Sequence, residues 1–155
     1  MEQTYAIELK NITKRFGKIV ANDGINLKVK RGEILSLLGE NGSGKTTLMN
    51  MISGIYFPDE GRILVDGKAV SIRSPKDSFD LGIGMIHQHF KLIDVMTAAE
   101  NIILGLKGNA VLDMKKVHKD IQELVDRYGF DLDPAQKVYT MSVSQKQTVE
   151  IVKML

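Results

Sequence analysis

The sequence predicts an α/β fold with three parts: an antiparallel β subdomain, an incomplete parallel core and a helical subdomain. Three observations predict it. Apolar and polar residues alternate along residues 5–29, which is typical of strands with one face in water. A short apolar run then leads through a glycine-rich loop into a helix-like stretch, and helical spacing dominates after residue 71. We expect residues 1–89 to form the core with its β subdomain and residues 90–155 to form the helical part.

The composition excludes several classes of protein. With 155 residues, 43% of them hydrophobic, the chain has material for one core. A net charge of +2 gives no basis for a nucleic-acid-binding surface, so we expect no nucleic-acid partner. The absence of cysteine excludes a disulfide scaffold and a thiolate metal site. The N-terminus lacks the apolar core of a signal peptide, and no apolar run approaches the roughly 18 residues of a membrane helix.

The first predicted elements are strands. Alternating apolar residues at 5–9 and 25–29 indicate two antiparallel strands. The nearly continuous apolar run at 34–38 predicts a strand buried on both faces. The dipeptide Asp66-Gly67 lies between two apolar stretches and predicts a two-residue hairpin turn.

Helices follow, with one further strand between them. Ser74 followed by Pro75 is typical of a helix start. Residues 83–86 indicate another short buried strand. Thr97 with Glu100 forms a capping box that opens the next helix. The segment is therefore expected to be mainly helical from residue 90 onward.

Two more helices complete the predicted order. Asp113 is expected to cap a helix that Gly129 ends. The apolar stripe of this helix is predicted to be Val117, Ile121, Leu124, Val125 and Tyr128. Ser142 with Gln145 forms a capping box for a last helix, which we expect to continue to residue 155 without a stop signal. An end in the middle of an apolar turn predicts that the chain is a fragment of a longer protein.

The strongest motif in the chain is a phosphate-binding loop. The pattern G-x-x-x-x-G-K-[ST] is matched at every fixed position from residue 39 to residue 46, between a predicted strand and a predicted helix. Glycines let the backbone direct N–H groups at phosphate oxygens, and the helix N-terminus adds its positive end. The residues expected to bind the phosphates of ATP are Gly39, Glu40, Asn41, Gly42, Ser43, Gly44, Lys45, Thr46 and Thr47.

Two side chains of this loop are expected to have separate roles. Lys45 would reach the β- and γ-phosphates, and the hydroxyl of Thr46 would bind Mg²⁺. The alternative is a glycine-rich turn between strand and helix that carries a lysine by chance. Because the motif and its context agree, we favour the functional interpretation, with ATP and Mg²⁺ as cofactors.

Three further features occur in a fixed order around this loop. Phe16 precedes it, Gln88 follows an apolar stretch, and the run Met-Ser-Val-Ser-Gln stands at 141–145. In this order the sequence resembles the nucleotide-binding domain of ABC transporters along essentially the whole chain. The resemblance implies that Phe16 stacks on adenine and that Gln88 contacts Mg²⁺ and the attacking water. It also implies that Ser142 binds the γ-phosphate of a nucleotide held by an opposing domain.

Taken alone, each of these residues has a simpler interpretation. Phe16 alone is more typical of a core aromatic at a strand end, and Gln88 of an ordinary polar residue there. Ser142 alone would be a helix cap, although a cap and an anion contact use the same helix N-terminus and are compatible. With the resemblance, the expected catalytic residues are Lys45, Gln88 and Ser142, and the expected metal ligands are Thr46 and Gln88.

The run at 141–145 departs from the Leu-Ser-Gly-Gly-Gln pattern of the family. Ser144 replaces the second glycine, and we expect its side chain to crowd the phosphate or to require a positive φ. The composite site that uses this run is therefore expected to be the weaker of a pair. The stretch 147–151 resembles the Q-x-V-E-I run of sugar and nucleoside importers, and the stretches 83–90 and 97–105 look most like the nucleoside branch.

In the family, an aspartate, a glutamate and a histidine hydrolyse ATP. They lie beyond the helix that Ser142 opens, so we expect none of them here. Asp66 is the nearest imitation of the acid, and its hairpin context favours turn chemistry. His87 and His89 could suggest a metal site, but no third ligand completes it. We expect this chain to bind ATP without hydrolysing it, within a parent protein that is an ATPase.

The expected function is that of the ATP-binding subunit of an ABC importer for nucleosides or simple sugars. Its partners would be integral-membrane permease subunits and a second ATPase half or copy, at the cytoplasmic face of the plasma membrane. A soluble ABC ATPase acting on ribosomes or DNA is the main alternative, but such proteins lack the Q-x-V-E-I run. A P-loop GTPase or kinase would leave residues 141–145 unexplained, and a nucleotide-binding module with no motor role also stays open.

Overall fold

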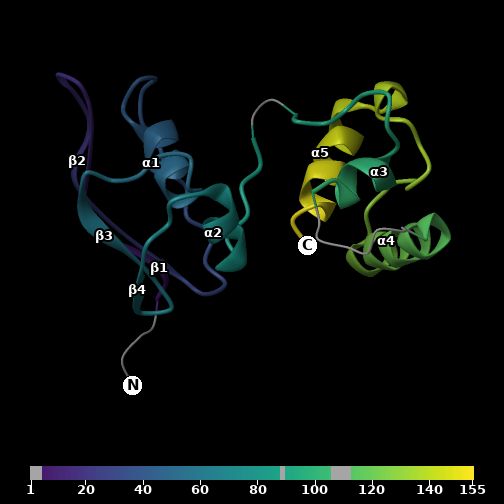
Figure 1. The fold of residues 1–155 in the computed structure, drawn as a ribbon, viewed down its shortest axis with the longest axis horizontal. Helices are drawn as coiled ribbons and strands as arrows, with labels where there is room; N and C mark the ends of the chain where they lie inside the picture. Colours follow the sequence, from purple (N-terminus) through teal and green to yellow (C-terminus); the bar gives the residue numbers. More distant parts are fainter. Residues whose placement is uncertain (1–4, 88–89, 106–112) are drawn as a thin grey trace. The chain divides into compact units, whose positions relative to one another are not determined.

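The computed structural model describes residues 5–87, 90–105 and 113–155. It separates into two compact units, Met1–Gly84 and Met85–Leu155. Each unit, drawn as a ribbon in Figure 1, has a hydrophobic core of its own among the described residues. The predicted domain division after residue 89 stays a prediction, because a compact unit is not by itself an independently folding domain.

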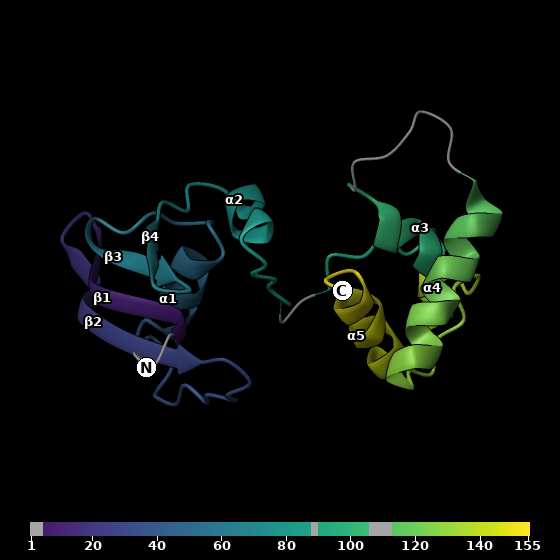
Figure 2. The ribbon, with the colours of Figure 1, turned by 90° about the horizontal axis from the view of Figure 1, so that it is seen from below.

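The first unit is built on a four-stranded antiparallel sheet (Figure 1, Figure 2). Its order is β2-β1-β3-β4, with β1 at Tyr5–Phe16, β2 at Ile19–Lys30, β3 at Glu60–Val65 and β4 at Lys68–Val70. Ile7 pairs with Val29 and Leu9 with Leu27, so the alternating apolar residues of both strands share one face. The predicted antiparallel pair is confirmed.

Strands β3 and β4 are joined by the expected two-residue turn. Asp66 (φ 49°) and Gly67 (φ 77°) both adopt the left-handed conformation that a type I′ hairpin turn requires. The Asp66 carboxylate accepts a hydrogen bond from the guanidinium of Arg31. Asp66 is therefore a turn residue, as its context predicts, and the structure adds that it has a basic partner.

Helix α1 (Lys45–Ile52) lies against the sheet and forms a common core with it (Figure 2). The buried members of this core are Leu9, Ile12, Leu48, Met51, Ile52, Ile63 and Ile72. At the end of α1, a β-carbon on Gly54 would come within 2.2 Å of the Ser74 carbonyl oxygen. Glycine is therefore required at this position. Ser74 caps the short helix α2 (Pro75–Asp80) by accepting from the Asp77 amide, as predicted.

Two predicted buried strands are not strands in this structure. Residues 34–38 and 83–86 have no ladder partner among the described residues. The residues Ile34 and Leu38 are 97% and 89% exposed. A strand forms only where a neighbour takes up its backbone N–H and C=O groups, and no described strand pairs with either of these two segments. The prediction was therefore wrong for this structure, although the apolar character of both segments is real.

The second unit is helical (Figure 1). It contains α3 (Ala98–Ile103), α4 (Met114–Tyr128), the 3₁₀ turn Val138–Thr140 and α5 (Val143–Val152). The predicted helix starts are confirmed: Thr97 with Glu100 and Ser142 with Gln145 form capping boxes, and Asp113 caps α4. Among the described residues, none of the helices combines the length and the apolar character that a bilayer-spanning helix requires.

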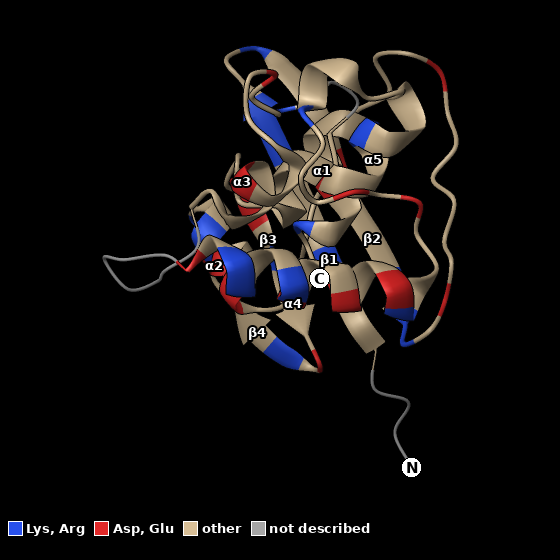
Figure 3. Ribbon diagram, turned by 90° about the vertical axis from the view of Figure 1, so that its right-hand side faces the viewer, with Lys and Arg blue, Asp and Glu red and all other residues tan. Residues whose placement is uncertain are grey.

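Helix α4 packs by only part of its predicted stripe. Ile121 and Val125 are buried as expected, whereas Tyr128 is 49% exposed. Tyr128 is the last helical residue and stacks on Phe130, with ring centroids 5.9 Å apart, instead of entering the core. Acidic and basic residues both occur along α4 (Figure 3), and they are exposed, which is typical of a helix with one face in water.

Helix α5 ends three residues before its predicted end. Beyond Val152, the amides of Met154 and Leu155 bond to carbonyl oxygens three residues back, at 2.9 Å and 3.2 Å. Such bonds tighten the last turn of a helix and satisfy its free carbonyls. The expectation of a continuous helix to residue 155 is wrong by about one turn.

Candidate functional site

The glycine-rich loop at 39–44 folds around the side chain of Lys45. The Lys45 ammonium donates to the carbonyl oxygens of Gly39 (2.8 Å) and Glu40 (2.7 Å) and to the hydroxyl of Ser43 (3.3 Å). The Ser43 amide donates to the Glu40 carbonyl at 3.2 Å and closes a tight turn. The loop therefore places a positive charge directly at the start of α1.

Gly44 fits the loop against strand β2. Its φ of 86° is left-handed, and a β-carbon here would come within 2.3 Å of the Ala21 carbonyl oxygen. The side-chain amide of Asn22 donates to the Gly44 carbonyl at 3.3 Å. Both the backbone conformation and the close approach to β2 demand glycine at this position.

The start of α1 has the features of an anion site. Its first turn contains no acidic residue, and the free N–H groups and dipole of a helix N-terminus favour a negative ligand. Thr46 is exposed and Thr47 half-buried in this turn. A β-carbon on Gly39 would come within 2.9 Å of the Ser43 hydroxyl, so a side chain there would require the Ser43 side chain to move. These residues fit the phosphates of a nucleotide, and the roles assigned to each of them stay predictions.

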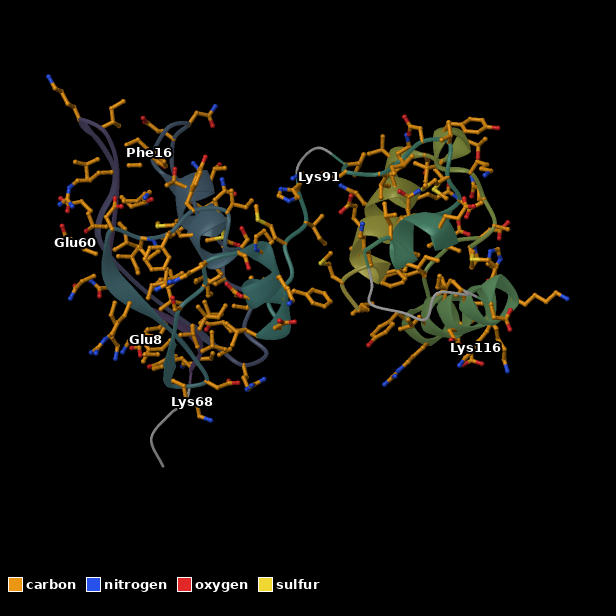
Figure 4. All side chains as sticks on the ribbon, in the orientation of Figure 1. Glu8, Phe16, Glu60, Lys68, Lys91 and Lys116 are labelled. Atoms are coloured by element: carbon orange, nitrogen blue, oxygen red, sulfur yellow. The ribbon has the colours of Figure 1, made fainter. Side chains whose placement is uncertain are left out.

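Phe16 lies at the same end of the sheet as Gly44. Phe16 pairs with Ile19 across the β1–β2 turn, and Lys14 pairs with Asn22, the residue that contacts Gly44. The residue, labelled in Figure 4, is 42% exposed. It is therefore not a fully buried core aromatic, which removes the simpler interpretation, while stacking on adenine stays a prediction.

An aromatic neighbour of Phe16 was missed by the sequence analysis. Tyr56, in the segment after α1, meets Phe16 edge-on with ring centroids 5.1 Å apart. Its backbone amide donates to the Asn50 carbonyl at 3.0 Å, which fixes the chain where it leaves α1. The sequence carries only a weak signal for this contact, namely the adjacent aromatics Tyr56 and Phe57 soon after the helix of the phosphate loop.

Ser142 is exposed at the N-terminus of α5, in the second unit. Its hydroxyl accepts from the Gln145 amide at 3.2 Å, and the Gln145 side chain accepts from the Ser142 amide at 3.0 Å. Ser144 lies in the first turn of α5, so the expected positive φ is wrong: a helical residue at this position needs no strained backbone. Crowding of a phosphate by Ser144 stays a prediction, as does the role of Ser142.

Gln88 and His89 lie outside the described residues, so the structure does not test the predictions for Gln88 or for the histidine pair. Within the part of the chain that the structure describes, no group of three or more His, Cys, Asp or Glu side chains could hold a metal ion. Thr46 remains the described candidate for Mg²⁺, by its place after the motif lysine.

Glu150 was also missed as a structural residue of this region. It is only 4% exposed, and its carboxylate accepts from the backbone amide of Lys91 at 2.9 Å (Lys91 is labelled in Figure 4). The contact ties α5 to the segment that begins three residues after Gln88. A buried carboxylate with a backbone donor is a strong local anchor, because losing the donor would leave a charge unsatisfied.

Together, the sheet with α1 and the lysine-centred loop define the class: this is a P-loop nucleotide-binding protein of the NTPase type. Residues 22–155 match the family model described as ABC transporter. The chain therefore belongs to the ABC transporter family, as the order of its motifs predicts.

Similar curated proteins include two nucleoside importers' ATP-binding proteins. The guanosine import ATP-binding protein NupO of Bacillus subtilis (strain 168) is 52% identical over 97% of this chain and 30% of NupO. The nucleoside import ATP-binding protein NupA of Lactococcus lactis subsp. cremoris (strain MG1363) is 50% identical over 100% of this chain and 31% of NupA. The chain thus spans about a third of the length of these relatives.

Solved structures show the same fold. The ADP conformation of MJ1267, an ATP-binding cassette of an ABC transporter, superimposes with a TM-score of 0.83 at 26% identity, covering 97% of this chain and 64% of that one. The dimeric structure of MJ0796, a bacterial ABC transporter cassette, gives 0.75 at 31% identity, with 96% and 68% covered. The predicted fold class, an α/β P-loop ATPase of the ABC type, is confirmed.

Proposed function

We propose that this chain is the ATP-binding part of an ABC importer for nucleosides or simple sugars. The observation that carries the proposal is the loop at 39–44, which curls around the Lys45 ammonium at the start of α1. Membership of the ABC family supports it, and so do the similar proteins named for guanosine, nucleoside and ribose import. ATP binding and hydrolysis in the whole protein would be coupled to transport.

Each residue of the site has a role in this proposal. Lys45 offsets the charge of the β- and γ-phosphates, and the backbone N–H groups of the loop donate to phosphate oxygens. Thr46 and Gln88 would hold Mg²⁺, which would supply positive charge to offset part of the negative charge of the phosphates. Phe16 offers its ring to adenine, and Ser142 donates to the nucleotide of an opposing ATPase half.

The proposed partners follow from the same family. Permease subunits in the membrane would receive the motion of the ATPase, which would lie peripherally at the cytoplasmic face of the plasma membrane. A second ATPase half or a second copy would complete each composite site. The dimeric structure of MJ0796 supports such pairing as a property of this fold.

The binding step is tested with Lys45→Ala in the full-length protein. Because charge-assisted hydrogen bonds to phosphate are lost, we expect the affinity for ATP-Mg²⁺ to fall by at least about tenfold in calorimetry. Chelating Mg²⁺ should weaken wild-type binding as well.

Lys119→Ala is the matched control for this substitution. Its side chain is 75% exposed on α4, so the same charge is removed without touching the loop, and the affinity should not change. Equal affinity of wild type and Lys45→Ala would contradict the proposal. The importer part is tested separately, by nucleoside and sugar uptake into cells that carry wild type or Lys45→Ala.

A further inference from the structure

The ring of Phe16 is held by groups that come from the segment after α1. Tyr56 meets it in a T-shaped arrangement, with ring centroids 5.1 Å and planes 71° apart. Phe16 and Tyr56 are 42% and 37% exposed. Edge-to-face pairs have a preferred geometry, so Tyr56 restricts the orientations that the Phe16 ring can adopt.

Asp59 fastens the end of β1 to the same segment. Its carboxylate accepts from the backbone amide of Arg15 at 2.6 Å and from the ammonium of Lys14 at 2.9 Å. The Asp59 amide donates in turn to the Thr13 carbonyl at 2.9 Å. These bonds lower the pKa of Asp59, first through the Arg15 amide and then through Lys14, so the carboxylate is charged at neutral pH.

The Lys14 ammonium links this anchor to the ring itself. Bound to Asp59, it lies 5.5 Å from the Phe16 ring centroid, within the range of a cation–π contact. Phe16 thus has an aromatic neighbour and a cation, and both are held by residues 56–59. Without these two contacts, a partly exposed phenylalanine at the β1–β2 turn would be free to change rotamer.

We propose that Tyr56 and Asp59 are positioning residues for a base-binding platform, in which they hold the Phe16 ring ready to stack on the base of the nucleotide. The inference rests on the proposed ATP-binding function and adds two residues to it. Preorganisation of this kind raises affinity because the ring need not be ordered when the ligand binds. It concerns the base alone, since the phosphates are held by the loop at 39–44.

The test compares two ligands that share phosphates but differ in the base. ATP carries adenine, whereas inorganic tripolyphosphate has none. In the full-length protein we expect Tyr56→Leu to lower the affinity for ATP by about three- to tenfold, the size of one aromatic pair, and to leave the affinity for tripolyphosphate unchanged. Asp59→Ala should likewise lower the affinity for ATP and leave the affinity for tripolyphosphate unchanged. Tyr56→Phe should bind ATP as the wild type does, because it keeps the ring.

Phe57→Leu is the matched control. Phe57 follows Tyr56, is 49% exposed, and faces the Arg73 guanidinium at 5.7 Å instead of Phe16, so its loss should leave both affinities unchanged. Equal losses for ATP and tripolyphosphate in Tyr56→Leu would indicate a purely structural role and overturn the inference. Unchanged ATP affinity in Tyr56→Leu would also overturn the inference. The proposed function would stand in either case, provided that the wild type binds ATP.

Discussion

Gly44 and Gly42 show how one backbone conformation can carry two different constraints. Both residues have φ 86°. A β-carbon on Gly44 would collide with the Ala21 carbonyl, whereas a β-carbon on Gly42 would meet nothing within 4 Å. The motif requires a glycine at the position of Gly44 in any phosphate loop of this type. In this structure, the close contact with β2 explains why Gly44 cannot be replaced by a residue with a β-carbon.

This difference predicts unequal effects of two identical substitutions. Gly42→Ala should destabilise the protein by about 1–2 kcal/mol, the cost of a left-handed alanine. Gly44→Ala adds a steric clash with backbone, so we expect about 2–5 kcal/mol and a loss of ATP binding. Urea unfolding and calorimetry of both variants check the prediction. Equal destabilisation by the two would show that β2 yields to the added carbon.

At the scale of elements, the helical unit depends on its helix starts. The capping box of α3 is reciprocal: the Thr97 hydroxyl accepts from the Glu100 amide, and the Glu100 carboxylate accepts from the Thr97 amide at 2.6 Å. Hydrogen bonding by the Thr97 amide, with smaller contributions from its hydroxyl and from Lys137, lowers the pKa of Glu100. The helix start is therefore sensitive to acid.

The sign of this pH dependence follows from the lowered pKa. The stability that Glu100 contributes is present above its unfolded pKa of about 4.3 and is lost as the pH falls through the lower folded value. Glu100→Gln should thus be less stable than wild type at pH 7, and the difference should shrink below about pH 4. Urea unfolding at pH 7 and pH 3 measures this. Glu123→Gln, with a side chain that is 68% exposed on α4, controls for the removal of one surface charge.

At the scale of the whole molecule, we propose that this chain binds ATP without hydrolysing it. Asp66 follows an apolar run, as the hydrolytic aspartate of the family does, but it lies in a hairpin turn and bonds to Arg31. Asp66 is followed by Gly67 and not by a glutamate. The relatives it matches are about three times as long, so hydrolysis and transport belong to the proposal for the whole protein.

Residues 1–155 alone are expected to release no phosphate from ATP. Lys45 and Thr46 are proposed to bind and neutralise phosphates, but activation of water also requires a base, and we expect none from the motifs of this sequence. A phosphate-release assay against a blank without protein checks this. Release that disappears in Lys45→Ala would contradict the prediction, since it would show hydrolysis at this loop.

The sequence by itself determined the local features of this protein. The phosphate loop, the hairpin at Asp66 and the capping boxes at Thr97 and Ser142 each depend on residues that lie close together in the sequence, where composition and conformation are directly linked. The order of Phe16, the phosphate loop, Gln88 and residues 141–145 also indicated the family. The turns, the helix caps and the phosphate loop could therefore be predicted from the residues that form them.

The tertiary structure decided what depends on residues far apart in the chain. The contacts of Phe16 with Tyr56 and of Lys91 with Glu150 join distant segments, and no local pattern encodes them. The strand predicted at 34–38 failed for the same reason: its apolar pattern marks it for burial, but a strand exists only beside a partner. Pairing and packing are properties of two segments at once, so they had to be seen in three dimensions.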